Sequence, residues 1–328
     1  MIETSSYAYL CNCNVRAQKW KTRPYDRMRV YITVRRSLDE LYISMSIVGS
    51  FLSQLYHFVA FRLEKPKMRL EMGMFIISID VDVGSKELGV INRGRNDRNV
   101  NRNISEYRVG EIEEAALPLF VETFNDLEIP VTFAIRGQLT ELKDSILELL
   151  LESSVKHDIG AHGYYHRKFT DLSRNEAENE LKMILRGMKR FGIIPRTFVF
   201  PVNSVDHLNL LEKYGYKCYR GCGGLMNDCM YIEKCGELYN IHPSIYIDQH
   251  TKFSFLKKFL DVSTKKRLPF HVWFHLWNFA QDEGHLQRSI DNIFVRLFNY
   301  AKRKEKSGIL TFETMFSSAE KVEKVTGL

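Results

Sequence analysis

Short apolar runs alternate with helical stretches along most of the chain. The runs predict strands over Phe75–Ile79, Val131–Ile135, His157–Gly160, Thr197–Phe200, Lys217–Tyr219, Leu238–Ile241, Phe270–Phe274 and Ile309–Thr311. The stretches between them predict helices over Glu111–Leu127, Leu139–Leu151, Arg174–Phe191, Val205–Tyr214, Phe253–Val262 and His285–Lys302. Such alternation indicates parallel β/α units, and seven or eight strands over about 240 residues favour a closed (β/α) barrel over a doubly wound sheet.

A different pattern precedes these runs. Leu41–Phe61 contains no Asp, Glu, Lys or Arg, but its apolar residues follow a helical stripe and its serines fall on the opposite face. A helix embedded in lipid would be apolar all round, so we expect an amphipathic helix that docks on the body or on a partner. Basic residues flank the segment, and contact with an anionic membrane surface stays an alternative. No signal peptide is evident.

Charge separates the chain into two parts. Its 328 residues carry 47 Lys and Arg against 40 Asp and Glu, a net charge of +7. Residues 1–70 hold 12 of the basic and 5 of the acidic residues, so the entire excess lies there. We therefore predict a basic N-terminal extension over 1–70 and a neutral globular domain over 71–328, with no nucleic acid as partner.

The six cysteines lack the spacing of a zinc ribbon, and we interpret them as reduced thiols. We expect a cytoplasmic protein, with association at the inner membrane surface as an alternative. The sequence predicts no oligomeric state.

Polar side chains follow several predicted strands. In a (β/α) barrel the active site lies at the carboxyl ends of the strands. The residues found at such positions are Asp80, Asp82, His162, His166, Pro201, Asn203, Arg220, His242, His275 and Trp277.

This inventory suits metal-assisted hydrolysis. Two imidazoles and a carboxylate form a three-ligand site for a divalent metal, a second carboxylate can accept a proton, and a further histidine can donate one. Other interpretations stay open: the aspartates can cap a turn, the His-x-x-x-His pair can be structural, and two histidines with a carboxylate also suit non-haem iron oxygenases. His271 lies within an apolar run and is expected to be a hydrogen-bonded core residue.

Three motifs carry a resemblance to a known family. They are a strand ending in Asp80-Val81-Asp82, the segment His162-Gly163-Tyr164-Tyr165-His166, and the closing segment Trp273-Phe274-His275-Leu276-Trp277-Asn278. Over roughly Gly73–Phe316 the chain resembles the polysaccharide deacetylase family, also called carbohydrate esterase family 4 or the NodB-homology domain. The resemblance implies an α/β fold, a deformed (β/α)7–8 barrel, here with an N-terminal helical extension. The residues of these motifs are similar to those of archaeal members of the family.

The resemblance also implies the chemistry. Asp80 is expected as catalytic base, His275 as general acid, and Asp82, His162 and His166 as metal ligands, with metal-bound water as the nucleophile. Zinc is expected, with cobalt, manganese or nickel as alternatives. The predicted activity is hydrolysis of a non-peptide C–N bond, the N-deacetylation of an N-acetylated sugar or polysaccharide. We expect the glycan to contact Tyr165, Pro201, Asn203, Arg220 and Trp277.

One motif departs from the family. The arginine that normally stands beside the proline of the third motif is absent, and Val202 lies in its place. Arg196 or Arg220 can substitute, and without such a partner the pKa of Asp80 is less controlled. A catalytically impaired glycan-binding protein is therefore one alternative. A cyclic imide or ring-amide hydrolase is another, suggested by Gly163 directly after the first histidine.

The polar segment Asn92–Asn103 contains four arginines. It is interpreted as a solvated loop, or alternatively as a lid that contacts an anionic substrate.

Overall fold

The structure is a computed structural model that describes residues 70–83, 109–221, 230–280 and 283–326. The predicted amphipathic helix, the arginine-bearing segment Asn92–Asn103 and nearly all of the basic extension lie outside these residues. The extension and its separation from a catalytic domain therefore stay predictions.

The core of the fold is a ten-stranded, mostly parallel sheet. Its strands are β1 (Gly73–Val81), β2 (Thr132–Ile135), β3 (Asp158–Ala161), β4 (Thr197–Val199), β5 (Cys218–Arg220), β6 (Ile232–Cys235), β7 (Leu238–Ile241), β8 (Ile245–Tyr246), β9 (Pro269–His275) and β10 (Leu310–Glu313). Their order is β6-β7-β5-β4-β3-β2-β1-β9-β8, with β10 beside β1, and among these described strands only β6 and β7 pair antiparallel.

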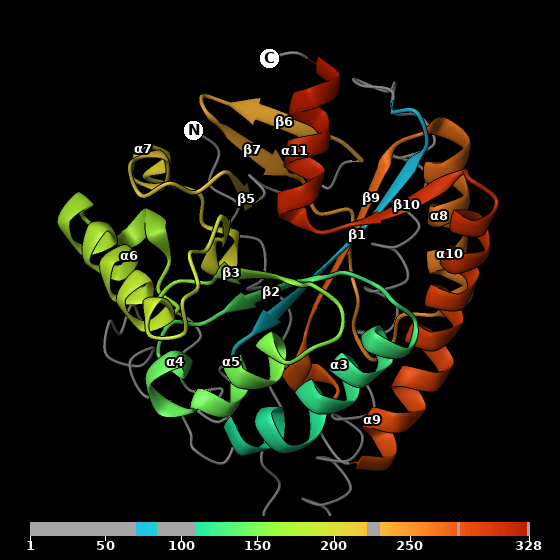
Figure 1. Cartoon of the computed structure of the whole chain (residues 1–328), viewed down its shortest axis with the longest axis horizontal. Helices are drawn as coiled ribbons and strands as arrows, with labels where there is room; N and C mark the ends of the chain where they lie inside the picture. Colours follow the sequence, from blue (N-terminus) through green and yellow to red (C-terminus); the bar gives the residue numbers. More distant parts are fainter. Residues whose placement is uncertain (1–69, 84–108, 222–229, 281–282, 327–328) are drawn as a thin grey trace, which may run out of the picture. The chain divides into compact units, whose positions relative to one another are not determined.

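Strand β1 is the centre of this sheet (Figure 1). All nine of its residues are buried, as expected for a parallel strand covered on both faces. Its first half pairs with β10, its second half with β2, and β9 runs along most of its length. The sheet curls into an incomplete barrel, and the predicted barrel class is confirmed.

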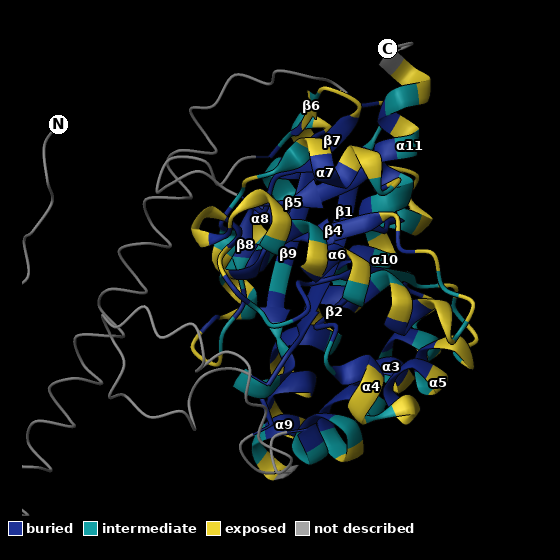
Figure 2. Cartoon of the chain, turned by 90° about the vertical axis from the view of Figure 1, so that its left-hand side faces the viewer, coloured by how far each residue is buried: buried dark blue, intermediate teal, exposed yellow. Residues whose placement is uncertain are grey.

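Helices cover the outside of the sheet. The main ones are α3 (Leu117–Asp126), α4 (Leu139–Leu142), α5 (Asp144–Leu151), α6 (Arg174–Lys189), α7 (Leu208–Lys213), α8 (Phe253–Lys266), α9 (Glu283–Ser289), α10 (Arg296–Lys306) and α11 (Met315–Thr326). A cluster of phenylalanines joins α3 to β9, with the ring centroids of Phe120 and Phe274 5.0 Å apart. Figure 2 shows the resulting pattern, in which most strand residues are buried and exposed residues lie on the outer faces of the helices.

The eight predicted strands are all present, but two strands and one α-helix were not predicted. These are β6, β8 and α11. Strand β8 has only two residues, too few for a periodic pattern to show. The predicted helix over 139–151 is interrupted at Lys143, whose extended backbone (φ −147°, ψ 97°) separates α4 from α5.

Candidate active site

The two aspartates lie at the carboxyl end of β1. Asp80 pairs in register with Ala134 of β2 on one side and with His275 of β9 on the other. Because side chains two apart in a strand point to the same face, Asp80 and Asp82 are presented together. Both are almost completely buried, with 1% and 2% of their surface exposed. Two buried carboxylates at one strand end require compensating cations or metal.

The two histidines of the His-x-x-x-His segment follow β3. Between them the chain turns sharply, with positive φ angles at Gly163 (64°) and His166 (58°). A Cβ atom at Gly163 would lie 2.7 Å from Cγ of Pro201, so both the backbone angle and the close approach require glycine there. The turn brings the rings of His162 and His166 to a centroid distance of 4.8 Å.

Asp82, His162 and His166 form a cluster with the composition of a catalytic metal site. One ligand atom from each lies within 4.8 Å of the others, and Nε2 of His166 is 3.2 Å from Oδ2 of Asp82. Nδ1 of His162 lies 2.9 Å from the carbonyl oxygen of Val199, to which it can donate, which leaves Nε2 as the lone-pair donor. That Nε2 atom is buried and has no hydrogen-bond partner among the described residues.

Burial keeps both imidazoles neutral. It lowers the pKa of His162, and it lowers the pKa of His166 to about 3, although Asp82 opposes both shifts. Neutral imidazole is the form that binds a metal ion. The orphaned Nε2 atom, the adjacent carboxylate and the neutral rings together fit a divalent cation.

The guanidinium of Arg220 is paired with the other aspartate. Arg220 ends β5, is 1% exposed, and its Nη2 donates to Oδ2 of Asp80 at 2.5 Å. Burial raises the pKa of Asp80, but the charge and the hydrogen bond of Arg220 hold it well below its usual range. Asp80 is therefore an ionised carboxylate. Its second oxygen, Oδ1, is buried without a hydrogen-bond partner in the described part of the chain.

The hydrogen bonds of Arg220 continue into the core. Its Nη1 donates to Oγ of Ser78 at 2.7 Å, and that hydroxyl lies 2.8 Å from Nε2 of His271. The guanidinium also stacks over the ring of Trp273, 4.3 Å from its centroid. His271 is thus a buried, hydrogen-bonded core residue, as predicted. Ser78 was not singled out from the sequence, although a serine within the apolar run of β1 is a detectable signal.

His275 reaches the same carboxylate from the neighbouring strand. Its Nε2 is 3.5 Å from Oδ2 of Asp80, and its Nδ1 is 3.3 Å from the hydroxyl of Tyr246. That hydroxyl also accepts a hydrogen bond from the amide of Asn278. Burial raises the pKa of Tyr246 to about 12, so the phenol keeps its proton. Sequence reasoning missed Tyr246 because β8 is so short.

The residues predicted to contact the substrate have different surroundings in the structure. Trp277 donates from Nε1 to Oδ1 of Asp82 at 2.9 Å, so it holds a ligand of the predicted metal. Pro201 is buried against Gly163, and Tyr165 packs its ring against Tyr164. Asn203 is half-buried and shares with its neighbour Val202 a positive φ angle.

Two further residues from the sequence analysis have other partners or positions. Nε2 of His242 is 3.1 Å from a carboxylate oxygen of Glu233 on β6. Arg196 lies just before β4, at the end of the strand opposite to the site. Of the two arginines proposed as substitutes for the missing family arginine, it is Arg220 that contacts Asp80.

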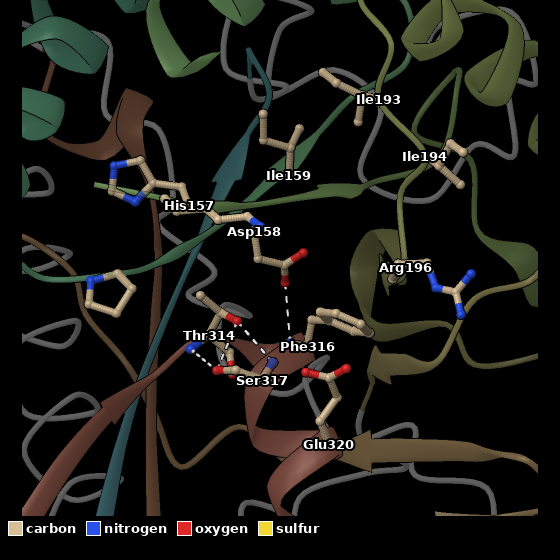
Figure 3. A pocket seen from close by; sticks show the side chains of 12 residues that line it. His157, Asp158, Ile159, Ile193, Ile194, Arg196, Thr314, Phe316, Ser317 and Glu320 are labelled. Carbon is tan, nitrogen blue, oxygen red and sulfur yellow. Dashed lines mark hydrogen bonds between the residues drawn. The ribbon is translucent and has the colours of Figure 1, made fainter. Parts of the chain in front are cut away.

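Arg196 lines a cavity of about 500 Å³ (Figure 3). The cavity lies where β3 and α11 begin, and there Asp158 accepts a hydrogen bond from the backbone of Phe316. It is therefore at the opposite end of the strands from the residues that can perform chemistry.

Gly163→Ala tests the turn between the histidines. Alanine at positive φ costs about 1–2 kcal/mol, and at this position it also meets Pro201. Gly192→Ala is the matched control, since Gly192 also has positive φ (71°) but has nothing within 4 Å of the added carbon. We expect Gly163→Ala to lower the free energy of unfolding more than Gly192→Ala in urea titrations. Equal losses would show that the contact with Pro201 is easily relieved.

Comparison with known proteins finds a matching family model over one third of the chain. The sequence model of the polysaccharide deacetylase family matches residues 110–219. No curated protein sequence matches the chain.

Several solved structures share the fold. A polysaccharide deacetylase candidate from Mycobacterium smegmatis superposes with a TM-score of 0.60 at 13% identity, covering 80% of this chain and 94% of its own. A second candidate, from Pseudomonas aeruginosa PAO1, gives 0.57 at 12% identity, with 76% and 91% covered. PuuE allantoinase gives 0.56 at 14% identity, with 76% and 90% covered. The family match over residues 110–219 and the shared fold confirm the predicted resemblance.

Proposed function

We propose that this chain, which carries a polysaccharide deacetylase domain, removes the acetyl group from an N-acetylated sugar or polysaccharide with the help of a divalent metal ion. One observation carries the proposal. A three-ligand cluster, an ionised carboxylate and an imidazole, contributed by three strand ends, lie in mutual contact. This is the inventory needed for hydrolysis of an amide bond.

Asp82, His162 and His166 would hold the metal ion, with zinc as the first candidate. A divalent cation held there would polarise the amide carbonyl and lower the pKa of a bound water molecule. Trp277 and the carbonyl of Val199 orient two of the ligands through the hydrogen bonds described above. Such outer contacts set the direction of the ligand lone pairs.

Asp80 and His275 would move the protons. Arg220 occupies Oδ2 of Asp80 and leaves Oδ1 to accept a proton from the attacking water. His275 donates a proton to the departing amine nitrogen, which leaves as a neutral group. One proton is taken up and one is delivered, so the products are acetate and a free amine after the residues exchange protons with solvent.

The contact between Arg220 and Asp80 favours an active enzyme over an impaired glycan-binding protein. Impairment was suggested by the valine at position 202, where the family has an arginine. A guanidinium from β5 supplies the same charge to Asp80. A ring amide is the second candidate substrate, because Gly163 follows the first histidine and the fold is shared with an allantoinase.

The test is an acetate-release assay on N-acetylated glycans beside ammonia and ring-opening assays on cyclic imides and ring amides. We expect acetate release that disappears after treatment with a strong chelator and returns when Zn²⁺ is added. Ring opening without acetate release would select the second candidate. Binding of glycans without turnover of any compound in the presence of Zn²⁺ would contradict both.

Location stays a separate proposal. No helix in the described ranges is long and apolar enough to cross a membrane. Deletion of residues 1–70 should change the fraction of the protein that sediments with anionic vesicles while kcat is retained. Sedimentation that is unchanged by the deletion would contradict membrane contact through the extension.

A further inference from the structure

A buried carboxylate on α6 contacts the loop that joins the two histidines. Glu180 is 1% exposed and lies on the apolar side of the helix, among Ala177, Leu181 and Ile184. An ionised group in such surroundings is costly unless its oxygens are fully hydrogen-bonded. Its partners therefore indicate why glutamate occupies a position that helix packing alone would give to an apolar residue.

Within the described part of the chain, the hydrogen bonds of Glu180 all go to that loop. Its Oε2 accepts from the backbone N–H groups of Tyr164 at 2.6 Å and Tyr165 at 2.8 Å. Its Oε1 accepts from Nε of Arg167 at 2.8 Å. These three donors belong to the residues between and directly after the two histidines, so one carboxylate binds the whole turn.

The other side of the loop is held by backbone donors. The N–H of Gly137 donates to the carbonyl of Gly163 at 2.8 Å, and the N–H of Gln138 donates to the carbonyl of Tyr164 at 3.3 Å. Donors and acceptors of the turn are thus both satisfied by neighbouring elements. This fixes a backbone that contains two positive φ angles, at Gly163 and at His166.

We propose that Glu180 is a positioning residue for the metal site: it holds the turn in the conformation that sets His162 and His166 against Asp82. The inference rests on the proposed function, since it assigns a role toward the metal ion. The carboxylate of Glu180 bonds to Tyr164, Tyr165 and Arg167 and not to the histidine rings or Asp82, so it acts through the loop. Loss of such an outer contact costs about 10- to 100-fold in metal affinity.

The chemistry of the clamp makes Glu180→Gln a sharp variant. The volume is retained, but an amide has one acceptor oxygen and one donor nitrogen. Whichever way it is turned, its NH₂ group faces either the two backbone N–H groups or the guanidinium of Arg167. A donor then meets a donor in a buried place.

Glu178→Gln is the matched control on the same helix. Its carboxylate accepts from Nζ of Lys213 and from the hydroxyl of Tyr214, both at 2.7 Å, and neither residue belongs to the histidine loop. Glu180→Asp is the second variant, because it keeps the charge but withdraws it by one methylene group.

The experiment measures Zn²⁺ dissociation constants of the full chain by competition with a chromogenic chelator, and the visible spectrum of the Co²⁺-loaded protein. We expect wild type and Glu178→Gln to bind one Zn²⁺ with the same Kd. Glu180→Gln should bind about 10- to 100-fold more weakly, with an altered Co²⁺ spectrum. Circular dichroism checks that each variant is folded. If Glu180 had a purely structural role, its replacement would lower Tm but leave the Kd of the folded protein for Zn²⁺ unchanged.

Wild-type Kd values and spectra in folded Glu180→Gln would overturn the inference and leave the proposed function standing. If that variant does not fold, the same decision falls to Glu180→Asp. A wild-type chain that binds no divalent metal would contradict the proposed function, and the inference with it.

Discussion

Asp80→Asn is expected to lower kcat/KM for acetate release by about 10²- to 10⁴-fold, the range associated with a lost general base. The ligand cluster of Asp82, His162 and His166 does not include Asp80. Zinc content should therefore stay at one ion per chain. The measurement combines metal analysis with initial rates on the best substrate from the screen.

The expected loss of activity follows from the replacement of a carboxylate by an amide at position 80. An amide keeps the size of the side chain and can still accept from Arg220, but it cannot take a proton from water. It also leaves the guanidinium of Arg220 without its counter-charge, so folding is checked by circular dichroism at the assay temperature.

Asp206→Asn is the control for this variant, since Asp206 is an exposed aspartate outside the site. Rates within about threefold of wild type for Asp80→Asn would remove Asp80 from the mechanism. Loss of zinc together with activity would instead show that Asp80 is needed to hold the metal.

Much of the site could be predicted from strand direction alone. The carboxyl ends of parallel strands meet at one edge, so the residues after β1, β3 and β9 were expected to converge. In the structure, Nε2 of His162 lies 3.7 Å and Nε2 of His275 lies 3.5 Å from Oδ2 of Asp80. The same rule separates Arg220, which ends β5, from Arg196, which precedes β4.

Other features could not be read from sequence patterns. Tyr246 lies in a two-residue strand, and the position of such a strand depends on tertiary contacts with β9. Glu180 looks like one of several acidic residues on a helix rich in Glu and Lys, and only its packing against the histidine loop distinguishes it. His242 follows the strand-end rule but is turned toward β6, an antiparallel edge strand that the alternation of parallel units does not predict.

Arg220→Met is expected to destabilise the folded chain by about 3–5 kcal/mol, because it leaves the buried carboxylate of Asp80 without its cation. Activity should fall by about 100-fold or more, as when one preorganised charged donor is removed from an active site. The free energy of unfolding from urea titration and kcat/KM from initial rates measure the two effects.

Two control variants separate the effect of the positive charge at position 220 from the effects of side-chain geometry and of position in the fold. Arg220→Lys keeps the positive charge but cannot reach Asp80 and Ser78 with a rigid fork, so an intermediate loss is expected. Arg196→Met removes the other candidate arginine and should leave kcat/KM unchanged. A loss of activity in Arg196→Met that matches Arg220→Met would contradict the assignment of Arg220.

The pH dependence of kcat/KM and of stability tests the role of Arg220 independently. In the wild type, burial raises the pKa of Asp80, and Arg220 is the strongest of the groups that lower it well below the usual range. The carboxylate therefore stays ionised as the pH falls, and the stability that the pair contributes is lost only in strong acid.

Without Arg220 the positive charge that opposes the effect of burial on Asp80 is gone, so the pKa of Asp80 rises. The acid limb of kcat/KM, and the loss of stability with falling pH, should both move to higher pH in Arg220→Met. An acid limb at the wild-type position in a folded Arg220→Met protein would mean that Asp80 is not the group whose ionisation the reaction requires.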